Sequence, residues 1–293
     1  MSKSNVYFSR EITPEKVLEM YKILNKNLEG NVAVKVHSGE KGNPNFLRPP
    51  FFKPIVDHVK GTIVECNTAY QGSRNSTEKH TKLMSEHGWS KLFKVDILDS
   101  QGPDLKLDMP YGKIINYNLV GKNLKNYNSM LVLSHFKGHA MGGYGGALKQ
   151  LSIGVASSAG KTHIHSAGKT QKQEELFENF AKQEYFLQAM AESAKSVVDY
   201  MNSNVAYINV MCNMAINCDC AANADGPVMK DIGILSSLDP VALDQACVDL
   251  VYSSNDPGKK HLIERIESRK GLLTIEFAEK LGLGSKKYQL IEV

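Results

Sequence analysis

The sequence predicts an α/β protein with a largely parallel mixed sheet flanked by helices. Short apolar runs, typical of buried strands, alternate along the chain with amphipathic runs typical of helices. Polar residues follow several of the apolar runs directly, as they do where parallel strands end at a ligand site. Together these two observations favour a sheet whose carboxyl edge carries the chemistry.

The first 133 residues alternate helix-like and strand-like segments. Thr13 and Pro14 predict the start of a helix, and apolar residues recur at helical spacing until Gly30. The elements expected after it are strand 31–36, helix 50–59, strand 62–68, helix 76–87, and strands 94–97, 113–118 and 130–133. This βαβα alternation predicts parallel pairing.

The remainder of the chain continues the pattern. Asp239 and Pro240 are typical of a helix start. The other expected elements are a helix starting at 147, an extended segment through 163–165, a long helix over 171–201, strands 205–211 and 231–236, two surface helices within 259–281, and a last strand 288–293. With no repeat or linker in view, we expect a single α/β domain over 1–293, with a possible subdivision near 170.

Composition excludes several classes of protein. The 293 residues are 42% hydrophobic and 23% charged, with a formal net charge of +4, all ordinary globular values. No run of 18 apolar residues is present, and the first residues are polar, so we expect no membrane partner and a cytoplasmic location. The small, dispersed charge gives no reason to expect nucleic acid.

The stretch 130–169 is the expected site. His135, Lys137 and His139 follow an apolar run, and the glycines after them permit close approach of backbone N–H groups to an anion. A helix starting at 147 would point its free N–H groups at the same place. GGYGG matches neither the dinucleotide nor the P-loop pattern. His163 and His165 alternate on the expected extended segment, so they would share a face. A lone histidine is usually only polar, but four of nine lie within 135–165.

The cysteines form a second group. Five cysteines without a leader sequence argue against a disulfide framework, and Cys66 and Cys247 lie in apolar runs. Cys218 and Cys220, with Asp225 nearby, are metal-capable, although a structural zinc site needs four ligands and a standard iron–sulfur cluster four thiolates. Free thiols and a metal or redox role both remain open for this pair.

Two long stretches carry a family resemblance. SHFKGHAMGGYGGALKQLSIGVASSAGKTHIHSAGK and INCDCAANADGPVMKDIGILSSLDPVALDQACVDL closely resemble a bacterial and archaeal domain of unknown function, usually labelled an uncharacterised iron–sulfur-center protein. Long members of that family carry a two-cluster ferredoxin module after the HxHSxxK segment, whereas here Lys169 runs straight into QKQEELFENF. The resemblance implies an iron–sulfur cluster, but the ferredoxin cysteines are absent.

A more distant resemblance concerns the glycine stretch. Residues 142–156 are similar to the GxxGGxxKxxxxGxA segment of nickel-pincer lactate racemases, and His139 precedes it. The resemblance implies that Lys149 carries a cofactor or anchors an anion, that His139 is an acid/base, and that His165 ligates a metal. Arg48 in LRPPFFKPIVD resembles the racemase TRPTP segment. Ser73, in QGSRNST, stands where racemases have a second acid/base histidine, and serine is a poor base near pH 7, so we expect no racemisation.

We therefore expect a metal-assisted enzyme that acts on a small anionic substrate by proton or hydride transfer. The expected catalytic residues are His139, Lys149 and Ser73; the cofactor- or anion-binding residues are Arg48, Arg74, Gly142, Gly145, Gly146 and Lys149; the ligands of iron, nickel or zinc are His163, His165, Cys218, Cys220 and Asp225. The alternatives are an iron–sulfur or metal-carrying redox protein that uses Cys218 and Cys220 with a redox partner protein, and a non-catalytic binding protein.

The last expectation is spatial. The loops bearing Arg48, Ser73, His139 and Cys218 all follow strand-like runs, and a parallel sheet brings such ends to one edge. We expect these loops to converge, and the cysteines to join the histidines in one mixed metal site.

Overall fold

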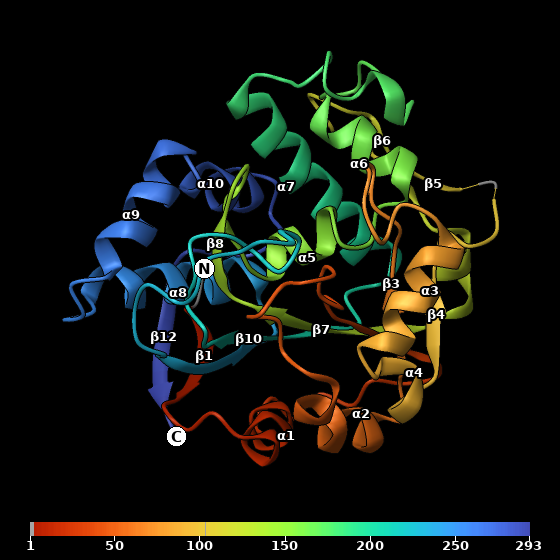
Figure 1. The fold of residues 1–293 in the computed structure, drawn as a ribbon. Helices are drawn as coiled ribbons and strands as arrows, with labels where there is room; N and C mark the ends of the chain where they lie inside the picture. The colour runs from red at the N-terminus through yellow and green to blue at the C-terminus, as the bar shows by residue number, and fades with distance from the viewer. Residues whose placement is uncertain (1–2, 103) are drawn as a thin grey trace.

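An eight-stranded mixed sheet organises the molecule (Figure 1). The computed structural model describes residues 3–102 and 104–293. Across the sheet the strands are β12 (Tyr288–Glu292), β1 (Ser4–Ser9), β11 (Gly233–Ser237), β10 (Val205–Met211), β7 (Ser129–His135), β2 (Val32–Lys35), β3 (Thr62–Glu65) and β4 (Val95–Ile97). Only β11 runs against its neighbours in this sheet, so the predicted fold class is confirmed. Strands from both sides of residue 170 share the sheet.

Helices cover both faces of the sheet. One face packs against α1 (Pro14–Lys22), α2 (Lys53–Val59) and α4 (Trp89–Leu92), and α3 (Thr77–Glu86) lies beside β4. The other face is covered by α5 (Ala147–Ser152), α7 (Gln183–Tyr200) and α8 (Pro240–Ser253). Helix α9 (Lys259–Ser268) packs on α8, and α10 (Leu272–Lys280) packs on α7 and α8. Two apolar cores therefore lie above and below the strands.

Two predicted helix starts are confirmed. The side chain of Thr13 accepts a hydrogen bond from the backbone N–H of Lys16, and Pro14 begins α1. Asp239 accepts hydrogen bonds from the backbone N–H groups of Val241 and Ala242 at the start of α8. Both ends use local cap chemistry, which explains why they could be predicted.

Other elements differ from expectation. The predicted extended segment at 163–165 is wrong, because it belongs to α6 (Ser158–His165), whose Ser157 cap accepts a hydrogen bond from the N–H of Gly160. The long helix begins only at Gln183, after a short 3-10 turn, η3 (Gln173–Glu175). The strand expected at 113–118 becomes β6 (Tyr117–Val120), which pairs with β5 (Leu105–Asp108) outside the main sheet. Strand β1 was not predicted.

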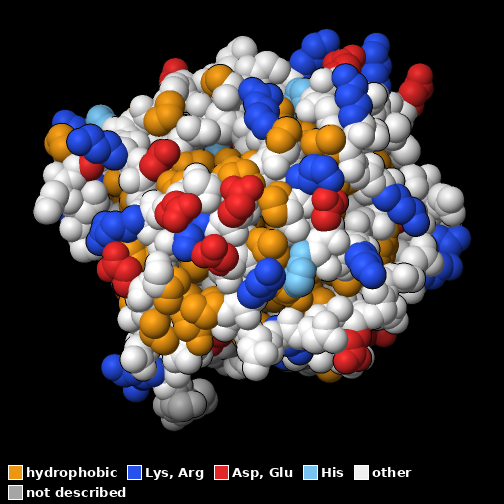
Figure 2. Space-filling view, turned by 90° about the horizontal axis from the view of Figure 1, so that it is seen from below, with side chains coloured by type: hydrophobic (Ala, Val, Ile, Leu, Met, Phe, Trp, Pro, Cys, Tyr) orange, Lys and Arg blue, Asp and Glu red, His pale blue; other side chains and the backbone are white. Residues whose placement is uncertain are grey.

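No helix in the ranges 3–102 and 104–293 is long and apolar enough to cross a membrane. Figure 2 shows the face seen from below, where acidic and basic side chains are intermingled.

Candidate functional site

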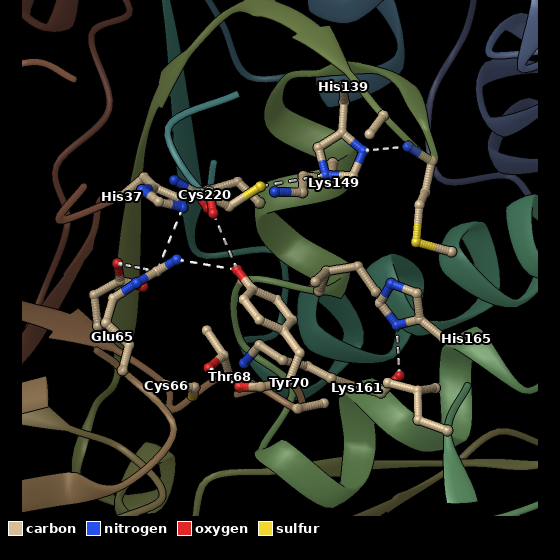
Figure 3. A pocket seen from close by; sticks show the side chains of 18 of the residues that line it. His37, Glu65, Cys66, Thr68, Tyr70, His139, Lys149, Lys161, His165 and Cys220 are labelled. Atoms are coloured by element: carbon tan, nitrogen blue, oxygen red, sulfur yellow. Dashed lines mark hydrogen bonds and ion pairs between the residues drawn. The ribbon is translucent and has the colours of Figure 1, made fainter. Parts of the chain in front are cut away.

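A pocket of about 220 Å³ opens at the carboxyl edge of the sheet (Figure 3). Segments that follow β2, β3, β7 and β10 meet there, and α5 and α6 close its wall. The hairpin of β8 (Lys137–His139) and β9 (Gly143–Gly145) brings His139 into the lining. The polar side chains that line the pocket include His37, Glu65, Tyr70, Arg74, His139, Lys149, Lys161, His165 and Cys220.

The pocket contains two lysines without a carboxylate partner. In the described part of the chain, no carboxylate oxygen lies within 4.0 Å of the Nζ atom of Lys149 or of Lys161, and Lys161 donates only to the backbone oxygen of Ala156, at 2.6 Å. Burial, followed by the cations of Lys35 and Arg74, lowers the pKa of Lys149 to about 8. Burial also lowers the pKa of Lys161. Because no carboxylate of the described residues neutralises either lysine within 4.0 Å, the pocket favours an anion.

The neighbouring cations are neutralised internally. Lys35 pairs with Glu65 at 2.6 Å, and the Nε atom of Arg74 lies 3.1 Å from Glu40. Arg74 also donates to the hydroxyl of Tyr70 at 3.3 Å, a contact drawn in Figure 3. Arg74 therefore shapes the pocket, while the two lysines supply its uncompensated charge.

His139 has a fixed tautomer. Its Nδ1 accepts hydrogen bonds from the backbone N–H groups of Met141, at 3.2 Å, and Gly142, at 2.9 Å. Burial, followed by the charge of Lys149, lowers the pKa of His139 well below its usual range, so the ring is neutral near pH 7. A neutral ring whose Nδ1 accepts must carry its proton on Nε2. His139 therefore presents an N–H donor toward the cavity and Cys220.

His165 has the opposite tautomer. Its Nδ1 lies 2.7 Å from the backbone oxygen of Lys161, so Nδ1 carries the proton and donates it. Burial lowers the pKa of His165 to about 4, which keeps the ring neutral at pH 7. Its Nε2 therefore keeps a free lone pair. A histidine that donates Nδ1–H to a carbonyl in this way is typical of metal ligands.

Asp219 holds the Cys218–Cys220 loop in place. Its carboxylate lies 2.5 Å from the Nζ atom of Lys137 and 2.9 Å from the Nδ1 atom of His135. Burial alone would raise the pKa of Asp219, but its interactions with His135 and Lys137 hold that pKa well below its usual range. Because Asp219 is anchored beneath the loop, the two cysteines beside it are brought next to His139.

His139, Cys218 and Cys220 form a candidate metal site. Their ligand atoms all lie within 4.8 Å of one another, with Cys220 Sγ 3.9 Å from His139 Nε2. Sulfur and imidazole suit zinc, iron or nickel. Cys218 and Cys220 are joined by a disulfide, so the free-thiol interpretation does not describe this state. The two sulfurs can bind a metal only after the disulfide is reduced to thiolates. They are then better ligands than His139, because the Nε2 atom of that ring carries a proton.

The start of α5 differs from expectation. Its backbone N–H groups at Ala147 and Leu148 donate to the buried carboxylate of Asp244, at 2.8 and 3.0 Å. They are therefore not free to hold a substrate anion. Gly146 is required for this contact, because a Cβ atom there would lie 2.4 Å from an Asp244 oxygen. Gly145 and Gly146 line a smaller cavity of about 20 Å³ beside Lys149 and Cys218.

Eight expected site residues do not line the main pocket: Gly142, Gly145, Gly146 and Cys218, described above, and Arg48, Ser73, His163 and Asp225. Arg48 is exposed and stacks on Phe46, with 3.7 Å from its guanidinium carbon to the ring centre. Ser73 lines a separate surface hollow. His163 stacks on Tyr117, with ring centres 4.4 Å apart. Asp225 is exposed, and its backbone oxygen accepts a hydrogen bond from Asn45.

Several pocket residues were missed from the sequence, among them His37, Glu65, Tyr70 and Lys161. His37 and Glu65 lie at the carboxyl ends of β2 and β3, so the same strand-end rule that selected His139 could have found them. Lys161 carried no comparable signal, because it lies within α6, which the sequence did not predict.

Comparisons with known proteins place this fold in context. The model of a domain of unknown function, DUF362, matches residues 32–249. A search of the curated proteins finds no match. Among solved structures, the lactate racemase apoprotein from Thermoanaerobacterium thermosaccharolyticum is 13% identical over 70% of this chain and 50% of its own, with a TM-score of 0.44. A protein from Thermotoga maritima is 9% identical over 92% of this chain and 59% of its own, with a TM-score of 0.44. The chain thus spans 50% and 59% of the length of these two proteins.

Proposed function

This chain belongs to the domain of unknown function family DUF362, and we propose that it is a metal-dependent enzyme that acts on a small anionic substrate by proton or hydride transfer. One observation carries the proposal: two lysines without carboxylate partners share a pocket with two neutral histidines of opposite tautomer and a cysteine. Perturbed titratable groups that converge in a cavity are typical of catalytic sites.

Lys149 and Lys161 bind the substrate anion. Uncompensated charge within a partly enclosed cavity attracts a carboxylate more strongly than the same charge would in water. With its pKa near 8, Lys149 is mostly protonated at pH 7 and can donate to a carboxylate oxygen. Arg74 is bound to Glu40 and serves to hold Tyr70 and the pocket wall.

The two histidines divide the proton chemistry. His139 donates its Nε2–H to a substrate oxygen, which stabilises negative charge that develops there. His165 offers a lone pair at Nε2, which suits a proton acceptor or a metal ligand. Both roles require neutral rings, which the lowered pKa values of His139 and His165 supply.

Cys218 and Cys220 would hold the metal after reduction, beside His139. A bound divalent cation at that position would polarise a substrate oxygen as a Lewis acid. The cation would also favour the thiolate form of both cysteines. The anchoring of Asp219 supports this role, because it holds the loop at the pocket rather than in solvent.

The anion site is tested with acetate as a probe. Replacing Lys149 or Lys161 with methionine keeps the side-chain length and removes the charge, so we expect acetate affinity, measured by calorimetry, to fall about ten- to hundredfold. Lys91→Met, on the exposed surface of α4, is the matched control and should bind acetate as the wild type does. The proposal fails if the folded wild type binds no carboxylate, or if both pocket variants bind acetate as tightly as it does.

A second candidate function is a redox or metal-carrying protein without substrate turnover. The Cys218–Cys220 disulfide favours it, because a closely spaced pair beside a cavity can exchange electrons with a partner dithiol. The two functions differ in what the lysines do. A carrier would keep its redox behaviour and metal content in Lys149→Met, whereas the enzyme would lose substrate binding.

A further inference from the structure

Part of the pocket lining is apolar. Leu176, Phe177 and Phe180 belong to the segment between α6 and α7 and line the cavity. Ile153 and Met141 extend this apolar lining. We call Phe177 and Phe180 the aromatic wall, and Leu176 adjoins them in the lining.

The aromatic wall runs continuously from solvent to a reactive histidine. Phe177 and Phe180 pack edge to face with ring centres 5.6 Å apart, and Phe180 lies 6.4 Å from the ring of His165. His165 in turn stacks on Phe186 at 4.8 Å. A ligand that extends from His165 along these rings would therefore contact Phe180 and then Phe177.

The wall is also exposed to an unusual degree. Phe177 is 69% exposed and Phe180 is 38% exposed, whereas the adjoining Leu176 is 3% exposed. Leaving two aromatic rings in water at a pocket mouth forgoes the free energy that their burial would provide. A ligand that covers them recovers that free energy.

We infer that the substrate is an amphipathic carboxylate, with an aryl or branched-alkyl group beside its charged end, rather than a small polar hydroxy acid. The inference rests on the proposed function for the anion site. The carboxylate binds Lys149 and Lys161, and the apolar group lies along Phe177 and Phe180. The bond that reacts is then held between these two ends, next to the Nε2 atom of His165.

The charge distribution supports this orientation over the reverse. Lys149 and Lys161 both line the pocket, and the aromatic wall contributes no charged group to the lining. An apolar group placed on the lysines would desolvate two charges without compensation. An anion placed on the phenylalanines would lose its hydration in the same way.

The test is a series of carboxylates of increasing apolar size. Calorimetry with acetate, butanoate, hexanoate and phenylacetate should show Kd falling with apolar size, by up to about fourfold for each methylene that becomes buried. Hexanol, which lacks the charge, should bind far more weakly than hexanoate. In the double variant Phe177→Ser with Phe180→Ser, the ratio of the acetate and hexanoate Kd values should approach one.

Tyr185→Ser provides the matched control. Tyr185 is 50% exposed on α7 and does not line this pocket, so the variant should keep the full dependence on chain length. If the wild type binds acetate and hexanoate equally, this inference is wrong while the proposed anion site stands. If the dependence persists in the phenylalanine double variant, the wall serves another occupant, such as a protein partner, and the inference is also overturned. Loss of all carboxylate binding by the wild type would instead remove the proposed function.

Discussion

Asp219 is the residue on which the cysteine pair depends. It lies between Cys218 and Cys220 and points its carboxylate at Lys137 and His135. The two ring nitrogens of His135 lie 2.9 Å from Asp219 and 2.6 Å from the backbone oxygen of Cys212. One carboxylate therefore contacts both a buried lysine and a buried imidazole.

Replacing Asp219 with asparagine should destabilise the protein strongly. The shape is kept, but the buried Lys137 loses its counter-charge and His135 loses its carboxylate partner, and breaking a buried ion pair typically costs about 3–5 kcal/mol. Denaturant unfolding should show this loss in the free energy of unfolding. Asp225→Asn, nearby and exposed, should change that free energy little. Equal effects of the two substitutions would show that Asp219 has no anchoring role.

Helix α5 is the element that carries Lys149 into the pocket. Its short length gives it little stability of its own, and a residue of α8, Asp244, caps it across the core. The Asp244 carboxylate also accepts a hydrogen bond from Asn209 of β10 at 2.8 Å. Burial raises the pKa of Asp244 to about 6, while the N–H groups of Leu148 and Ala147 oppose that rise.

The close contact between Gly146 and Asp244 predicts the effect of adding one methyl group at residue 146. Gly146→Ala would place a Cβ atom 2.4 Å from an Asp244 oxygen, so the carboxylate must move away from the α5 N–H groups. Overpacking of this kind costs about 1–3 kcal/mol of unfolding free energy, measured by thermal or denaturant melts. Gly226→Ala, where a Cβ atom would meet nothing within 4 Å, is the control. A melt unchanged by the alanine at 146 would contradict this account of the cap.

Element prediction from sequence succeeded where the signal is local. The helix starts at Pro14 and Pro240 are determined by caps within three residues, and the buried strands β7 and β10 by apolar runs. It failed at α6, where alternating histidines suggested an extended segment although the Ser157 cap favours a helix. Strand β1 was missed because its place depends on β11 and β12, far along the chain.

At the scale of the whole molecule, the sheet edge explains which site residues could be predicted. The strand-end rule selected His139 and the loop of Cys218 and Cys220, and both meet at one edge. The same rule also selected Arg48 and Ser73, which do not line the main pocket. A loop that starts at the sheet edge can turn outward before it reaches such a residue. The Asp244 cap and the tautomers of the histidines depend on contacts that no spacing in the sequence encodes.

The central claim, a metal-dependent site at the cysteine pair, is tested most directly by elemental analysis. The protein should be purified anaerobically with a dithiol reductant, which converts the Cys218–Cys220 disulfide to two thiols. The account predicts a stoichiometric transition metal in the wild type and its loss in the variant Cys218→Ser with Cys220→Ser, while Cys247→Ser, at a buried cysteine outside the pocket, retains it. Reduced, folded wild type without stoichiometric metal, or a double variant that keeps it, would contradict the account.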